Sequence, residues 1–128
     1  VHLGSVIIQN DISEDIEVFA DPLLVKIIYN LIENAVRYGE TITKIRFYEE
    51  EASNLVLICE DDGVGVIPEE KERIFERGYG RNTGLGLALC RDILTITDIS
   101  IIETGEFGSG ARFEISIPST GWRKIPRD

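Results

Sequence analysis

Histidine and cysteine, the usual zinc ligands, are scarce in this 128-residue sequence, which contains one histidine and two cysteines. A zinc site is therefore not expected, because zinc in proteins needs several clustered Cys or His ligands. Cys59 and Cys90 lie far apart, each inside an apolar stretch. We expect both to be small buried side chains, with a disulfide or a metal-binding pair as the alternative.

Long apolar runs are missing as well. No stretch approaches the roughly 20 residues that cross a bilayer, and no basic segment followed by an apolar one opens the sequence. We therefore expect a cytoplasmic domain with no direct membrane contact. The expectation leaves open whether the full-length protein is anchored in a membrane.

Positive charge is the third shortage: 13 Lys and Arg stand against 23 Asp and Glu, which gives a net charge of −10. This balance argues against a nucleic-acid partner, because phosphate backbones are bound by clustered basic side chains. A small polyanion can still bind where local amides, a few arginines and a metal ion supply the opposite charge.

The apolar content of 43% predicts one folded domain with a hydrophobic core. Periodicity and turn residues divide the chain into short elements. We expect strands over residues 5–10, 16–20, 41–50, 54–61, 98–104 and 111–118, and helices over residues 20–39, 68–76 and 85–96. The domain is expected to cover residues 1–118. Residues 119–128 would be a C-terminal tail, whose Trp122 either docks on the domain or awaits a neighbour.

The helix over residues 20–39 has an apolar stripe with a polar border. Asp21 is a suitable N-cap and Pro22 fits the first helical position. Residues at helical spacing form the stripe: Leu24, Ile27, Ile28, Leu31 and Ala35. The border contains Asn30, Asn34 and Arg37, with Tyr38 nearby.

The polar border is suited to a phosphate ligand. An Asn amide oxygen fits a hard cation such as Mg²⁺, and Arg37 is placed to meet phosphate. Taken alone, the same residues also fit the ordinary polar edge of an amphipathic helix.

Two glycine-rich segments follow. The first, DDGVG (residues 61–65), comes directly after a buried strand and places Asp61 to accept a hydrogen bond from an amine such as that of adenine. The second, TGLGL (residues 83–87), opens a helix, where free N–H groups favour phosphate. Each also has a simpler interpretation, an Asp-Gly turn and a helix cap without ligand. The spacing matches neither G-x-G-x-x-G nor a Walker loop.

The order of these segments resembles the catalytic, ATP-binding domain of sensor histidine kinases, in the superfamily that also holds gyrase B and MutL. NLIENAVRY (residues 30–38) is similar to the N box, DDGVG to the G1 box, RIFERG (residues 73–78) to the F box and TGLGLAL (residues 83–89) to the G2 box. The resemblance covers roughly residues 5–118. It implies an α/β fold of the Bergerat type, a two-layer sandwich with a mixed, mostly antiparallel sheet covered on one face by about three helices.

The resemblance implies roles for the N-box residues. Asn34 would ligate Mg²⁺ with the assistance of Asn30. Arg37 matches the basic position that meets phosphate, and Tyr38 matches the aromatic residue beside the nucleotide.

The glycine boxes are assigned in the same way. Asp61 would hold the adenine amino group, while Gly63 and Gly65 let the backbone come close to the base. The phosphate side would be lined by Thr83, Gly84, Leu85, Gly86 and Leu87. Arg81 would contact the γ-phosphate.

The function implied is that of the catalytic domain of a two-component sensor histidine kinase. It would present Mg–ATP for phosphoryl transfer to a histidine on a separate dimerisation domain, with a response-regulator receiver domain downstream. Superfamily ATPases use a glutamate to activate water where this sequence has Asn30, so the amide favours transfer over hydrolysis. His2 lacks the acidic residue and the proline of the family's acceptor segment. The isolated chain is therefore expected to bind ATP without autophosphorylating.

Two other functions stay open. Gly78 stands where the F box often has a second aromatic, only eight residues separate Phe75 from Gly84, and Ala111 replaces a common Thr or Ser. These departures fit a module that binds nucleotide and acts only in protein interaction or allostery. The lack of an acceptor histidine also fits an anti-sigma-type serine kinase of the same superfamily. Upstream helices with an acceptor histidine would favour the histidine kinase.

Overall fold

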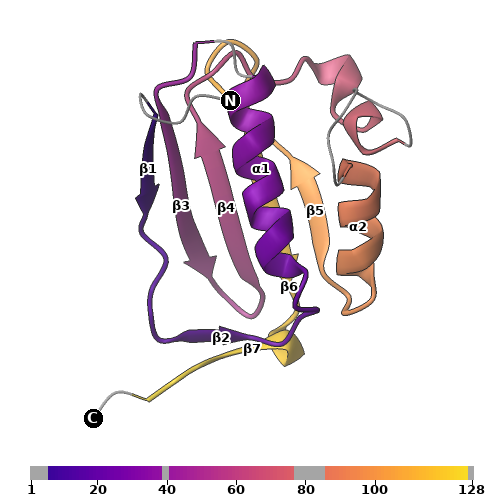
Figure 1. The fold of residues 1–128 in the computed structure, drawn as a ribbon. Coiled ribbons are helices and arrows are strands. Elements are labelled where there is room, and N and C mark those ends of the chain that lie inside the picture. The colour runs from indigo at the N-terminus through magenta and orange to yellow at the C-terminus, as the bar shows by residue number, and fades with distance from the viewer. Residues whose placement is uncertain (1–5, 39–40, 77–85, 127–128) are drawn as a thin grey trace.

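Alternating apolar and polar residues build a mixed five-stranded sheet (Figure 1). The structure is a computed structural model that describes residues 6–38, 41–76 and 86–126. The strands of the sheet are β1 (Ile7–Asn10), β3 (Lys44–Glu51), β4 (Leu55–Asp61), β5 (Ser100–Glu103) and β6 (Arg112–Ile117). The spatial order is β1-β3-β4-β6-β5. Only β1 and β3 run parallel; the other three pairs are antiparallel.

One face of the sheet is covered by helices. The α-helices are α1 (Leu24–Tyr38) and α2 (Leu87–Thr95), and Figure 1 shows both on the same side of the strands. The expected helix over residues 68–76 is instead two 3₁₀ turns, η1 (Pro68–Glu70) and η2 (Arg73–Phe75). With these turns as the third covering segment, the predicted two-layer α/β sandwich with a mostly antiparallel sheet is confirmed.

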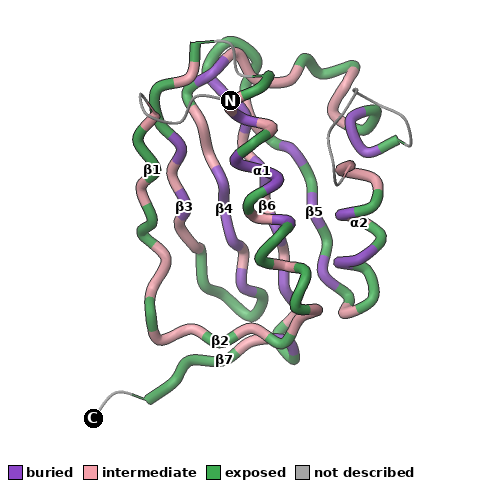
Figure 2. The backbone as a smooth tube through the Cα atoms, in the orientation of Figure 1, coloured by how far each residue is buried: buried purple, intermediate pink, exposed green. Residues whose placement is uncertain are grey.

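The core lies between α1 and the central strands. On β6, Phe113, Ile115 and Ile117 are buried and alternate with half-buried residues. On α1, Ile27 and Leu31 face them from the predicted apolar stripe. Figure 2 shows the buried segments concentrated along β4, β5 and β6 and on α1. This packing holds α1 in a fixed position over the sheet.

The first helix starts later than the sequence predicts. Asp21 Oδ1 accepts a hydrogen bond from the backbone N–H of Leu23 at 2.8 Å, and its carbonyl accepts one from Leu24 at 2.9 Å. Asp21 therefore caps as expected, but through a turn that contains Pro22 and precedes the helix. The predicted end at Gly39 lies outside the described residues.

The C-terminal segment packs on the domain, which is one of the two possibilities expected for Trp122. After η3 (Ser119–Gly121), strand β7 (Trp122–Lys124) pairs antiparallel with β2 (Ile16–Val18). The indole N–H of Trp122 donates to the Ser53 carbonyl at 3.1 Å, and its ring packs against the core. Strand β2 thus supplies a strand partner for the segment after Pro118.

The two cysteines behave as predicted: Cys59 and Cys90 are buried, and neither forms a disulfide within the described residues. Burial raises the pKa of the Cys59 thiol to about 12 and that of Cys90 to about 11. In the described part of the chain, no helix is long and apolar enough to span a bilayer.

Candidate functional site

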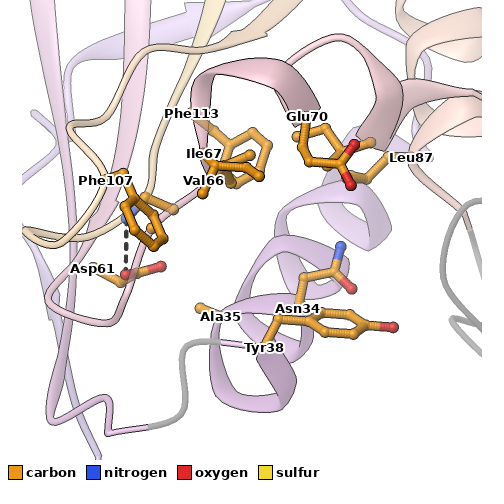
Figure 3. Close-up of a pocket in the computed structure, with 13 residues that line it drawn as sticks. Asn34, Ala35, Tyr38, Asp61, Val66, Ile67, Glu70, Leu87, Phe107 and Phe113 are labelled. Atoms are coloured by element: carbon orange, nitrogen blue, oxygen red, sulfur yellow. Dashed lines mark hydrogen bonds between the residues drawn. The ribbon is translucent and has the colours of Figure 1, made fainter.

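A cavity of about 340 Å³ opens between the C-terminal half of α1, the loop after β4, the two 3₁₀ turns and the start of α2 (Figure 3). Its described lining is mostly apolar, with three polar or charged side chains besides Tyr38. The lining residues are Asn34, Ala35, Tyr38, Asp61, Gly65, Val66, Ile67, Glu70, Ile74, Leu87, Phe107, Ala111 and Phe113. A largely apolar cavity with a few converging polar groups is typical of a small-molecule site.

Asp61, the last residue of β4, presents its carboxylate to this cavity. Oδ1 accepts hydrogen bonds from the backbone N–H groups of Gly63 (2.9 Å) and Ala111 (3.1 Å). Between Asp61 and the described residues, no hydrogen bond engages Oδ2. Burial raises the pKa of this carboxyl and outweighs the lowering by the two backbone N–H groups. Asp61 therefore offers one carboxylate oxygen to a donor in the cavity.

Glycines let two loops meet backbone to backbone beside Asp61. Gly65 has a φ of +79°, and a Cβ there would come within 2.8 Å of the Gly110 carbonyl oxygen. Gly110 has a φ of +127°, and a Cβ there would overlap the Asp61 carbonyl oxygen at 1.9 Å. Only glycine fits this contact, which brings the turn after β5 against the loop after β4.

The N-box residues separate in the structure. Asn34 and Tyr38 line the cavity. Asn30 is only 4% exposed, is not among the described lining residues, and donates through its amide to the Cys90 sulfur at 3.6 Å. Arg37 is exposed in the last turn of α1 and does not line the described cavity either.

The N-terminus of α2 forms another part of the wall. Gly86 occupies the N-cap position without a side-chain cap, and Leu87 lines the cavity. The first backbone N–H groups of a helix have no partner inside the helix, so this end favours an anion. The predicted phosphate-side residues Arg81, Thr83, Gly84 and Leu85 lie outside the described residues.

The F-box aromatic Phe75 is anchored from two sides. Its ring makes an edge-to-face contact with Phe113, with centroids 6.3 Å apart and planes at 82°. The Arg91 guanidinium of α2 lies 3.9 Å from the Phe75 ring centroid and also donates to the Ile101 carbonyl. Phe75 therefore joins the 3₁₀ turns to the sheet and to α2.

A buried ion pair holds together two segments that lie next to lining residues of the cavity. The Glu103 side chain has no exposed area and is bonded to the Lys71 ammonium, which is 27% exposed. Glu103 Oε2 also accepts hydrogen bonds from the backbone N–H groups of Gly105 (2.9 Å) and Arg112 (3.0 Å). Lys71 donates in addition to the Gly105 carbonyl at 2.7 Å. This cluster ties the segment after η1 to the turn between β5 and β6.

Sequence reasoning missed several residues of the site. Glu70 and Phe107 line the cavity, and Glu103 supports its wall. A signal for Glu103 was present. Glu103 lies two residues after the buried Ile101 on the same strand, so both side chains point to the same, inward face of the sheet. For Phe107, the signal was an aromatic residue inside the glycine-rich stretch GEFGSG.

The family assignment comes from comparison with known proteins. The model for histidine kinase-, DNA gyrase B- and HSP90-like ATPases matches residues 20–121, and the chain belongs to this family. The sensor histidine kinase RcsC of Escherichia coli (strain K12) is 32% identical over 111 residues, which cover 79% of this chain and 12% of RcsC. The autoinducer 2 sensor kinase/phosphatase LuxQ of Vibrio harveyi is 29% identical, over 94% of this chain and 16% of LuxQ. The chain thus spans a small part of these relatives.

Solved structures agree on the fold. The nucleotide-free catalytic domain of histidine kinase ThkA is 28% identical and superimposes with a TM-score of 0.72, covering 95% of this chain and 81% of that one. Full-length ShkA, solved in complex with AMPPNP, is 23% identical with a TM-score of 0.77, covering 95% of this chain and 27% of ShkA. At that lower identity the likeness shows the fold alone.

Proposed function

We propose that this domain binds Mg–ATP in the cavity and presents the γ-phosphoryl group to a histidine on a separate dimerisation domain of a sensor kinase. The observation that carries the proposal is the environment of Asp61. One of its oxygens is held by two backbone N–H groups, and the other is available to an amine donor beside the apolar Val66 and Phe113. A purine with an exocyclic amino group matches this arrangement, with its edge at the carboxylate and its faces against apolar side chains.

The orientation of the nucleotide follows from the opposite end of the cavity. With the base at Asp61, the phosphates would extend toward Leu87 and the N-terminus of α2. The helix N-terminus favours their negative charge. The relatives support the same ligand, since RcsC is a sensor histidine kinase and the chain belongs to a family of ATPases.

The side chains near that end suit Mg²⁺. Figure 3 shows Asn34 and Glu70 approaching the same part of the cavity from opposite walls. Glu70 Oε2 is buried without a hydrogen-bond partner in the described structure, although it lies 3.1 Å from Arg73 Nη1. No group of three or more His, Cys, Asp or Glu among the described residues forms a metal cage. An amide and a carboxylate oxygen, completed by phosphate oxygens and water, are what Mg²⁺ prefers, so Asn34 and Glu70 would hold it.

Phosphoryl transfer rather than ATP hydrolysis is proposed because residue 30 is an asparagine and not a glutamate. Helix α1 has one carboxylate, Glu33, and it is exposed. Asn30 is an amide and cannot accept a proton from water. A neutral histidine on a partner domain is itself a good nucleophile, so the domain needs to position ATP and screen its charge.

The partners proposed are therefore the dimerisation domain that carries the acceptor histidine and, downstream, a response-regulator receiver domain. Phosphoryl transfer to the histidine and onward transfer to the receiver domain would both take place in the cytoplasm. The net charge of −10 argues against a nucleic-acid partner.

The test is a transfer assay with ATP labelled on the γ-phosphate and the dimerisation domain of the same kinase. We expect acid-labile, alkali-stable label on that domain, lost when the chain carries Asp61→Asn. Acid-stable label on a serine would instead identify the serine kinase. Free phosphate without labelled protein would identify an ATPase. ATP binding with no turnover would identify a degenerate binding module.

A further inference from the structure

Phe107 is an exposed aromatic residue at the mouth of the cavity. It lies in the turn between β5 and β6, lines the cavity, and is 55% exposed. Figure 3 shows its ring beside Asp61, at the end of the cavity where the proposed function places the base. Exposing a large aromatic ring to water is unfavourable, and such a ring next to a polar acceptor in a cavity is suited to a flat ligand.

The turn that carries Phe107 is anchored on both sides of the ring. On one side, the backbone N–H of Gly108 donates to the Val64 carbonyl at 2.7 Å, which ties the turn to the loop after β4. On the other, Glu103 and Lys71 bind the backbone of Gly105. The backbone position of Phe107 is therefore fixed before any ligand enters.

The surroundings favour contact through the face of a base rather than through its edge. Ala111, which directly precedes β6, lines the same region and offers no side-chain hydrogen bond. Asp61 is the hydrogen-bonding side chain at this end of the described lining. Additional affinity for a base has to come from apolar and stacking contact, which Phe107 is placed to supply.

We propose that Phe107 is a base-binding residue that stacks on the purine of the bound nucleotide. This inference rests on the proposed function, since it assumes that a purine occupies the Asp61 end of the cavity. Stacking tolerates any base because every base has a π-face. Phe107 therefore contributes affinity, while Asp61 selects the amino group.

The test is titration calorimetry of ADP with the wild type, Phe107→Ala and Phe107→Tyr. The matched control is Phe19→Ala, which removes a phenylalanine that is 76% exposed and does not line this cavity. We expect Phe107→Ala to weaken ADP binding by about tenfold, Phe107→Tyr to restore it, and Phe19→Ala to leave it unchanged. The melting temperature should stay near that of the wild type, because the ring is mostly exposed.

Two further measurements separate stacking from other effects. The affinity for Mg–tripolyphosphate, which has no base, should be unchanged by Phe107→Ala, and the ratio of ADP to inosine diphosphate affinity should also be unchanged. Nuclear Overhauser contacts between the adenine protons and the Phe107 ring should appear in the complex. Equal ADP affinity of the wild type and Phe107→Ala would overturn this inference alone. No ADP binding by the wild type would overturn the proposed function with it.

Discussion

The side-chain amide of Asn30 donates to the sulfur of Cys90 at 3.6 Å and so joins α1 to α2 inside the protein. Asn34, one helical turn further along α1, is half-buried and lines the cavity. The two amides on one side of the helix therefore have different surroundings. One is enclosed between helices, and the other is open to a ligand.

Replacing these two asparagines by alanine should have different effects. Asn34→Ala should weaken the binding of ADP in the presence of Mg²⁺ by at least about tenfold, because a metal ligand is lost. In EDTA, the wild type and Asn34→Ala should bind ADP alike. Asn30→Ala should lower the free energy of unfolding by roughly 1–3 kcal/mol, because it leaves a small cavity and removes the buried hydrogen bond that joins α1 to α2.

Calorimetry with and without Mg²⁺ checks the first effect, and urea denaturation checks the second. If Asn34→Ala keeps the full Mg²⁺ dependence of ADP binding, Asn34 is not a ligand of the metal.

The two thiols should be unreactive in the folded protein. Burial raises the pKa of Cys59 to about 12 and that of Cys90 to about 11, and the thiolate is the reactive form. With a chromogenic disulfide reagent at pH 8, we expect neither thiol to react within minutes, and both to react after unfolding in guanidinium. Rapid reaction of either thiol under native conditions would show that α2 or β4 opens from the core.

Removing the charge of Lys71 should destabilise the domain. Lys71→Met leaves the Glu103 carboxylate buried with only its two backbone donors. Breaking a fully buried pair costs about 3–5 kcal/mol, and the loss here should be nearer about 2 kcal/mol because Lys71 is partly exposed. The double variant Lys71→Met with Glu103→Gln should recover part of the loss.

The matched control for that pair is Asp11→Asn. It breaks an ion pair with Arg46 in which both side chains are well exposed, at 37% and 42%, and such pairs contribute at most about 1 kcal/mol. Urea denaturation of all four proteins gives the comparison. A smaller loss for Lys71→Met than for Asp11→Asn would show that the cluster does not hold the cavity wall.

Asp61→Asn should make the ligand-free domain slightly more stable at neutral pH. The pKa of Asp61 is raised in the folded protein, mainly by burial, so its ionised form costs stability above that pKa. The cost disappears as the pH falls below the ordinary carboxyl value of about 4, where the wild-type residue is protonated. The melting temperature of Asp61→Asn minus that of the wild type should therefore be positive at pH 7 and shrink toward zero at pH 4.

The order of the motifs was sufficient to predict the fold. Asp61, Asn34 and Leu87, which the resemblance assigned to the nucleotide site, all line one cavity. These positions depend on local patterns, a buried strand followed by glycines and a helix with one apolar face, which the sequence displays directly.

Other features depend on contacts between distant segments and could not be read from local patterns. The helical wheel placed Asn30 at a polar border, but α2 packs against that side and buries it. Strand β7 is too short to be recognised alone and forms because β2 lies beside it. Phe107 reaches the cavity because Gly110 allows its turn to approach the loop after β4.

The central claim is that a nucleotide binds with its base at Asp61. The most direct measurement is the melting temperature of the wild type and of Asp61→Asn with and without millimolar Mg–ADP. We expect the nucleotide to raise the melting temperature of the wild type, and we expect Asp61→Asn, although folded, to lose most of that rise. An unchanged wild-type melting curve, or an equal rise in the two proteins, would contradict it.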